Sequence, residues 1–217
     1  MRTITRNPNP PACLAQQPQA QDWRAFMNTP CHQQVGDSLR KEQCHVCCYC
    51  EVEITAGDSH IEHMAPRNPG HGLLPGPVYG YANLAASCNG GAVEHCGRFK
   101  DDRRRNSGYR YNAALFCLPH DPDTARLFQY LPNGTVQPAD GIDAQDARKA
   151  DYTIGYLGLK CARLTGRRCT HARQLIDTLG ANPDPALIDW AVEYYLNPDP
   201  QNRLRQFTSL SRKILNQ

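Results

Sequence analysis

The sequence predicts an α+β fold with three parts: an extended N-terminal arm, a compact cysteine-rich core and a mostly helical C-terminal half. Three observations support this prediction. Six of the 11 cysteines lie between residues 44 and 96, alternating residues over 51–63 are typical of strands, and apolar residues recur at helical spacing after residue 159. We place the boundaries near residues 39 and 112, so the parts are 1–39, 40–112 and 113–217.

The composition is that of a chain that folds around a core. The 217 residues carry 24 Lys and Arg against 21 Asp and Glu, a net charge of +3, and 40% are hydrophobic. This balance excludes a highly charged disordered chain. No run of about 18 apolar residues is present, so we expect no membrane span. The first residues contain no apolar stretch that could form the core of a signal peptide, so we expect a cytoplasmic protein with reduced cysteines.

The arm and the core differ in their patterns. Residues 1–30 are rich in Pro, Gln and Asn, and we expect an extended arm that docks through Trp23 and Phe26. In the core, alternation predicts a strand over 51–55 that turns and returns over 60–63. Prolines and glycines over 66–81 predict a long loop, and a short helix is expected near 96–105.

The clustered cysteines point to a metal. A Cys-x-x-Cys pair followed by two further cysteines is typical of a structural zinc site, which can hold together a segment too rich in Gly and Pro to bury much apolar surface. The expected ligands are Cys47, Cys50, Cys88 and Cys96. Alternatives remain open, because Cys44 also forms a Cys-x-x-Cys pair with Cys47, and His45 or His95 could replace a cysteine.

A Glu-His pair follows the first cysteines. Strand alternation places His60 and Glu62 on one face and His63 on the other. A carboxylate that binds a hard cation and a neutral imidazole that removes a proton from water are the groups that metal-assisted phosphodiester cleavage needs. Asn83 can hydrogen-bond the backbone near His63, and Asn89 can offer a carbonyl oxygen to a cation.

The C-terminal half contains one hairpin signal and three helix signals. Asn133-Gly134 between apolar alternating residues predicts a hairpin. A helix is expected over roughly 159–179, ending at Gly180. A second helix should begin at Asp184-Pro185 and stop before Asn197-Pro198, and a third should begin at 199–200 and continue to 214.

Basic residues in and after the predicted core helix suggest a nucleic-acid partner, because they can follow a row of phosphates. The residues expected to contact nucleic acid are Arg67, Arg98, Lys100, Arg103 and Arg104. Arginines at 163, 167, 168 and 173 either extend this surface or bind a partner protein.

About 60 residues of the core resemble the HNH endonucleases of the ββα-metal (His-Me finger) type. The motifs that carry this resemblance are Cys47-x-Tyr49-Cys50-Glu51, Ile61-Glu62-His63-Met64-x-Pro66-Arg67, Ser87-Cys88-Asn89-Gly90 and Cys96-Gly97-x-x-Lys100-Asp101. In detail they look like the PtuB-like HNH proteins of retron and Septu antiphage defence systems. The resemblance implies a zinc-stapled ββα-metal HNH core.

The resemblance also implies an activity: metal-dependent hydrolysis of phosphodiester bonds in DNA or RNA, with tRNA as one candidate substrate, in bacterial antiphage defence. It implies that His63 is the general base, that Glu62 binds a catalytic Mg²⁺ or Mn²⁺, and that the four cysteines bind Zn²⁺. The implied partners are a PtuA-type ATPase, onto which we expect the helical C-terminal half to dock, and a retron reverse transcriptase with its DNA.

One position departs from the family pattern. The third signature residue, Asn or His, directly follows the last cysteine, whereas this chain has Gly97, which offers no ligand atom. We expect Asn89 to bind the catalytic ion beside Glu62 in its place, with His95 as the alternative. The same departure favours a second function, a non-catalytic zinc module that binds nucleic acid or a partner protein.

Overall fold

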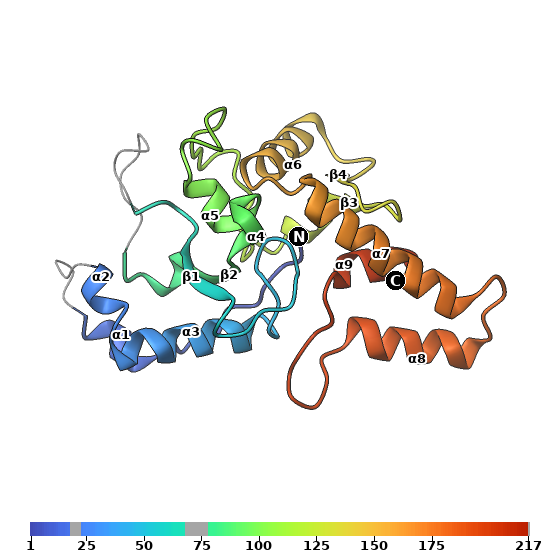
Figure 1. Ribbon diagram of the computed structural model, residues 1–217, viewed down its shortest axis with the longest axis horizontal. Coiled ribbons are helices and arrows are strands. Elements are labelled where there is room, and N and C mark those ends of the chain that lie inside the picture. Colours follow the sequence, from blue (N-terminus) through green and yellow to red (C-terminus); the bar gives the residue numbers. More distant parts are fainter. Residues whose placement is uncertain (18–22, 68–77, 217) are drawn as a thin grey trace.

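The computed structural model describes residues 1–17, 23–67 and 78–216 (Figure 1). It has an α+β fold in which β1 (Ser59–His63) and β2 (Leu84–Cys88) form one antiparallel sheet and β3 (Phe128–Tyr130) and β4 (Val136–Pro138) form another. The predicted loop over 66–81 lies largely outside the described residues.

The N-terminal part is more regular than the predicted extended arm. It contains α1 (Ala12–Ala15), α2 (Trp23–Phe26) and the longer α3 (Pro30–Glu42). The side chain of Thr29 caps α3 by accepting a hydrogen bond from the backbone N–H of His32 at 3.2 Å. The prediction of an extended arm is therefore wrong for these helical segments, whereas the burial of Trp23 and Phe26 agrees with their predicted docking.

A disulfide connects this part internally. Cys13 of α1 bonds to Cys31 of α3, so the expectation that the cysteines are reduced is wrong for this pair. Val35 and Leu39 of α3 are fully buried, and the helix packs against both β1 and β2. In Figure 1 the two strands lie between α3 on one side and α5 (Cys96–Asp101) on the other.

The strand pair of the core differs from the predicted one. β1 matches the predicted returning strand, but its partner is β2, with His63 opposite Leu84, and not residues 51–55. Those residues form one isolated bridge, between Glu53 and Val46, because a tight turn competes with a strand there. In that turn the N–H of Cys47 donates to the carbonyl of Val52 and the backbone of Glu51 is left-handed, with φ 63°.

The predicted C-terminal hairpin is confirmed. β3 and β4 pair around the Asn133-Gly134 turn, where Gly134 has φ 86°. A Cβ at Gly134 would lie 2.0 Å from the carbonyl oxygen of Thr165, so the close approach of the turn to α7 (Ala162–Leu179) also requires glycine.

Four helices follow the hairpin: α6 (Ala144–Tyr156), α7, α8 (Pro185–Leu196) and α9 (Thr208–Ile214). The predicted end of α7 at Gly180 and the predicted start of α8 are confirmed, and Asp184 caps α8 through the N–H of Leu187 at 2.8 Å. The predicted start of the last helix is wrong, because Asp199 accepts hydrogen bonds from the backbone within a turn and α9 begins only after Phe207.

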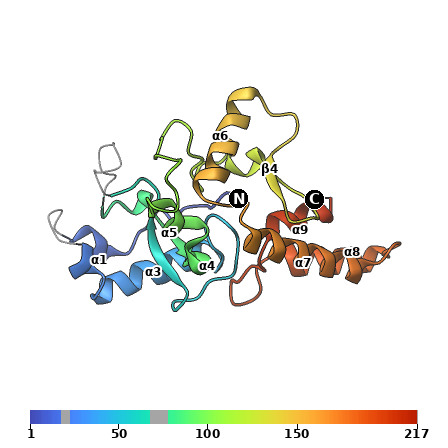
Figure 2. The same ribbon diagram turned by 45° about the horizontal axis from the view of Figure 1, so that its top comes forward.

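The larger hydrophobic core contains buried residues from all three parts of the chain, from Met1 near the N-terminus to Leu210 in α9. In a smaller core, residues of α7 and α8 pack against Leu215, which follows α9. In the turned view, α7 and α8 extend side by side away from the strands (Figure 2). None of the helices in the described parts of the chain combines the length and the apolar composition needed to span a bilayer. The strand pair and the start of α5 belong to the larger core, which includes Ile61, Leu84 and Cys96.

Candidate active site and metal centre

Four buried thiols from three separate elements converge in the core. They belong to Cys47 and Cys50 in the turn before β1, Cys88 at the end of β2 and Cys96 at the start of α5, and their sulfurs all lie within 4.8 Å of one another. The Sγ atoms of Cys50 and Cys88 are 3.6 Å apart and those of Cys47 and Cys96 are 3.8 Å apart. Zinc–sulfur bonds of about 2.3 Å in a tetrahedron separate the sulfurs by about 3.8 Å, which these two pairs match, so this cluster could bind zinc.

The geometry distinguishes between the alternative zinc ligands that the sequence left open. Cys44 lies outside it and donates its S–H to the side-chain oxygen of Asn202 at 3.6 Å. His95 is at its edge, with Nδ1 3.1 Å from the sulfur of Cys96. The structure therefore groups Cys50 and not Cys44 with Cys47, and places His95 as a hydrogen-bond partner of the thiols.

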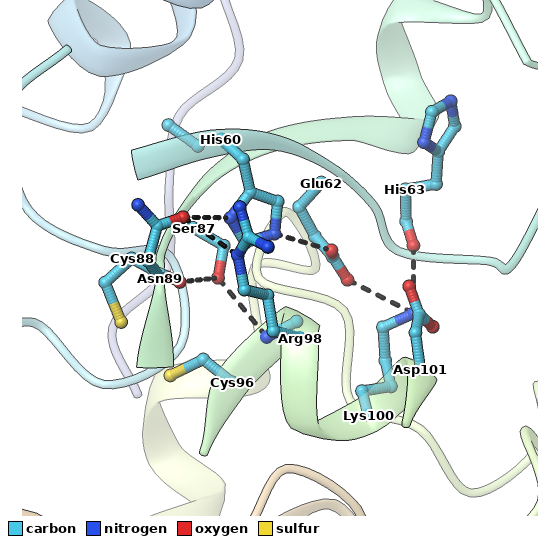
Figure 3. Close-up of polar contacts among 12 residues, drawn as sticks. His60, Glu62, His63, Ser87, Cys88, Asn89, Cys96, Arg98, Lys100 and Asp101 are labelled. Atoms are coloured by element: carbon cyan, nitrogen blue, oxygen red, sulfur yellow. Dashed lines mark hydrogen bonds and ion pairs between the residues drawn. The ribbon is translucent and has the colours of Figure 1, made fainter. Parts of the chain in front are cut away.

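Glu62 lies on the face of β1 that meets α5 (Figure 3). Its side chain is only 2% exposed, and its Oε1 contacts Nζ of Lys100 at 3.2 Å and accepts a hydrogen bond from the Tyr49 hydroxyl at 3.1 Å. Burial favours the neutral acid, but Lys100 and His60 outweigh it and lower the pKa of Glu62 to about 2. The carboxylate is therefore ionised throughout the neutral pH range.

His60 stands beside Glu62, as strand alternation predicts. Its Nε2 is 3.4 Å from Oε2 of Glu62, and its Nδ1 is 3.1 Å from Oδ1 of Asn89. Arg98 donates its Nε–H to the same Asn89 atom at 3.0 Å, which identifies that atom as the amide oxygen because a guanidinium cannot accept. Asn89 thus uses its carbonyl oxygen on His60 and Arg98, so the expectation that this oxygen binds the ion is not supported.

His63 occupies the other side of β1. Figure 3 shows its ring turned away from the Glu62 carboxylate. Its Nε2 is 2.9 Å from the carbonyl oxygen of Val78, and because a carbonyl only accepts, Nε2 carries the proton and Nδ1 keeps its lone pair. Burial lowers the pKa of His63 to about 4, so the ring is neutral at pH 7. Trp23 packs edge-on against it, with ring centroids 4.3 Å apart.

Asn83 acts on the backbone next to His63, as expected. Its side-chain oxygen accepts from the N–H of Ala65 at 2.8 Å, and its amide donates to the carbonyl of Ala65 at 3.0 Å. These two hydrogen bonds hold the segment that leaves β1 immediately after His63.

Gly97 faces the carboxylate directly. A Cβ at this position would lie 2.2 Å from Oε2 of Glu62 and 3.0 Å from Nε2 of His60. The position after the last cysteine thus points at the Glu62 carboxylate, which fills the space that a side chain at residue 97 would need.

The predicted nucleic-acid residues divide into two groups. Lys100 is 2% exposed and bonded to Glu62, Asp101 and the carbonyl of His63, so its predicted contact with phosphates is wrong. The others are exposed at the surface: Arg67, Arg98, Arg103 and Arg104.

Two residues beside the site, His60 and Trp23, had no predicted role in its chemistry. His60 could have been assigned from its spacing, because it shares a strand face with Glu62. Trp23 has no such signal, because 40 residues separate it from His63.

Comparison with known proteins gives one informative similarity. No model of a known protein family matches this chain. The chain is 27% identical over 149 residues to a protein of Vibrio cholerae serotype O1 biovar El Tor named "Retron Vc95 putative HNH endonuclease", and the aligned part covers 68% of this chain and 67% of that protein. At this low identity, and together with the buried cysteine cluster, the similarity supports a relationship to the HNH endonucleases and, at that coarse level, a nuclease role.

Proposed function

We propose that this chain is a metal-dependent HNH endonuclease that hydrolyses phosphodiester bonds of DNA or RNA. The observation that carries the proposal is the pair at the end of β1. Glu62 is ionised and faces α5, while His63 is neutral with its proton held on Nε2. An anionic oxygen ligand and a neutral imidazole on adjacent residues provide the two functions that metal-assisted phosphodiester hydrolysis requires.

Each residue of the site has a distinct role in this proposal. Nδ1 of His63 accepts the proton of the attacking water, because Val78 keeps the other ring nitrogen protonated. Lys100 keeps Glu62 ionised, and Asn83 positions the segment after His63. A Mg²⁺ or Mn²⁺ ion, when bound at Glu62, supplies the positive charge that stabilises the phosphate and the leaving oxygen. The four cysteines bind a structural zinc that fixes α5 against β1 and β2.

The cleavage assay compares wild type with His63→Ala on plasmid DNA and on tRNA, with Mg²⁺ or Mn²⁺ and with a PtuA-type ATPase added. We expect His63→Ala to cut 10²- to 10⁴-fold more slowly, as loss of a general base usually does. His45→Asn is the matched control, because His45 lies outside the site and Asn tolerates its left-handed backbone, φ 59°. Equal cutting by wild type and His63→Ala would contradict the proposed mechanism.

We further propose a role in retron-linked antiphage defence, with a reverse transcriptase and its DNA and a PtuA-type ATPase as partners. The name of the Vibrio cholerae relative supports the retron context. Two stacked aromatic rings on α8 support a docking role for the helical half, because Trp190 and Tyr194 are 46% and 40% exposed. Co-purification of the ATPase should be lost in the Trp190→Ala/Tyr194→Ala double variant and kept in Met27→Ala, which removes an exposed side chain elsewhere.

The second candidate, a zinc module that binds without cutting, is favoured by Gly97, because this position lacks the usual ligand. The same assay separates the two functions. Binding of nucleic acid with identical residual cutting in wild type and His63→Ala would favour the non-catalytic module.

A further inference from the structure

The space between β1 and α5 contains two polar side-chain atoms that face each other. Nε2 of His60 and Oε2 of Glu62 lie 3.4 Å apart. Lys100 contacts Oε1 of Glu62 at 3.2 Å, which leaves Oε2 directed at His60, and Nδ1 of His60 donates a hydrogen bond to Oδ1 of Asn89. Nε2 of His60 and Oε2 of Glu62 therefore converge on one space that a cation can occupy.

The hydrogen bonds around His60 fix the direction of its free nitrogen. Asn89 holds Nδ1 at 3.1 Å, and Arg98 in turn holds the Asn89 oxygen at 3.0 Å. A histidine that binds a metal through one ring nitrogen usually donates a hydrogen bond from the other nitrogen to an oxygen. His60 has this arrangement, with Nε2 directed toward Glu62.

Gly97 has no side chain that could bind an ion, so a second protein ligand would have to come from another element, and His60 on β1 is close enough. A Cβ at residue 97 would approach both Oε2 of Glu62 and Nε2 of His60, so the helix position and the His60 ring point to the same place. The His60 side chain is 22% exposed while Glu62 is 2% exposed, so solvent reaches the pair from the His60 side. An ion there would keep several positions for water and substrate phosphate, as Mg²⁺ and Mn²⁺ prefer.

We infer that His60 is the second protein ligand of the catalytic divalent ion and replaces the side chain that Gly97 lacks, while Asn89 is the residue that positions its ring. This inference rests on the proposed nuclease function for the role of the ion. The binding of the ion can nevertheless be measured without any cleavage.

The test measures Mn²⁺ binding to the zinc-loaded full chain by electron paramagnetic resonance. Wild type should show the magnetic coupling of an imidazole nitrogen to the bound Mn²⁺. His60→Ala should lose this coupling and bind Mn²⁺ at least 10-fold more weakly, whereas His63→Ala should keep the coupling, because its ring lies on the other side of β1. His45→Asn controls for removal of a histidine elsewhere, and zinc content of one per chain confirms that each variant is folded.

Asn89 is tested by two substitutions. Asn89→Ala should weaken Mn²⁺ binding less than His60→Ala does and should alter the nitrogen coupling, and Asn89→Asp, which restores an acceptor for Nδ1, should recover both.

Two results would overturn the assignment of His60: a wild-type protein that binds no Mn²⁺, or an unchanged nitrogen coupling in His60→Ala. Failure of the nuclease function would look different. In that case wild type would bind Mn²⁺ with imidazole coupling and yet cut neither plasmid nor tRNA with the ATPase present.

Discussion

Glu62 occupies the space that a side chain at Gly97 would need: a Cβ there would lie 2.2 Å from Oε2 of the carboxylate. The carboxylate cannot easily move, because Lys100 and Tyr49 hold its other oxygen at 3.2 Å and 3.1 Å. The glycine after the last cysteine and the long side chain of glutamate on β1 are therefore complementary, and neither should be replaced alone without loss.

This complementarity predicts how substitutions of Gly97 and Glu62 affect stability when they are combined. Gly97→Asn alone should destabilise the protein by about 1–3 kcal/mol, which is typical of overpacking in a dense interior. Combining it with Glu62→Asp, which is one methylene shorter, should recover part of that loss. The double exchange should also restore Mn²⁺ binding in a His60→Ala background, because the new amide takes the place of the imidazole. Chemical unfolding and Mn²⁺ titration measure the two effects, and stability losses that simply add would contradict the complementarity.

The ion pair between Lys100 and Glu62 predicts a large effect of charge removal. Both side chains are almost fully buried, and the charge of Glu62 raises the pKa of Lys100 against the opposing effect of burial. Lys100→Met leaves the carboxylate without its partner, so we expect a loss of about 3–5 kcal/mol in the free energy of unfolding. Arg104→Met, on an exposed arginine, should change it by less than about 0.5 kcal/mol. Similar small losses for both variants would show that the pair contributes little.

How far the site could be predicted from the sequence depended on the local signal. Strand alternation predicted that His60 and Glu62 share one face of β1 and that His63 lies on the other, since residues two apart share a face. Lys100 could not be placed in the same way, because α5 spans only Cys96–Asp101 and a helix of that length has no clear apolar stripe. Its burial depends on Glu62, which lies on another element.

The fold shows the same division. The capping residue Asp184 and the turn at Gly134 act within a few residues, and both predictions were confirmed. β2 was not predicted, because Leu84-Ala-Ala-Ser-Cys88 is buried along its whole length and therefore lacks alternation. The contact between Trp23 and His63 depends on the packing of α2 and α3 against the strands, which no local pattern encodes.

Removal of zinc should unfold the core. The four thiols connect three elements, and a structural zinc site contributes its binding free energy directly to folding. Cys96→Ser should contain less than one zinc per chain and lose its cooperative thermal transition, whereas Cys44→Ser should keep both. Elemental analysis by mass spectrometry and circular dichroism measure these properties. Retention of full zinc content by Cys96→Ser would exclude its sulfur from the site.

The stability of the N-terminal segment should depend on pH through His120, which is far in sequence from the four clustered cysteines. Burial and the neighbouring Arg6 lower the pKa of His120 to about 4, against an ordinary value of 6.5. Between these two values the unfolded chain binds a proton that the folded chain does not, so the free energy of unfolding falls as the pH falls from 6.5 to 4. A shift of this size corresponds to at most about 3 kcal/mol, and partial exposure of the ring reduces the expected loss to about 1–2 kcal/mol.

His120→Gln tests this dependence, because glutamine keeps an acceptor for Arg6 but does not titrate. The pKa of His171 is also lowered by burial, so the variant should flatten the pH profile of stability without abolishing its slope. Urea unfolding at pH 7 and pH 5 measures the difference. If the loss of stability between these two values is as large in His120→Gln as in wild type, the folded chain protonates His120 as readily as the unfolded chain does, and the prediction is wrong.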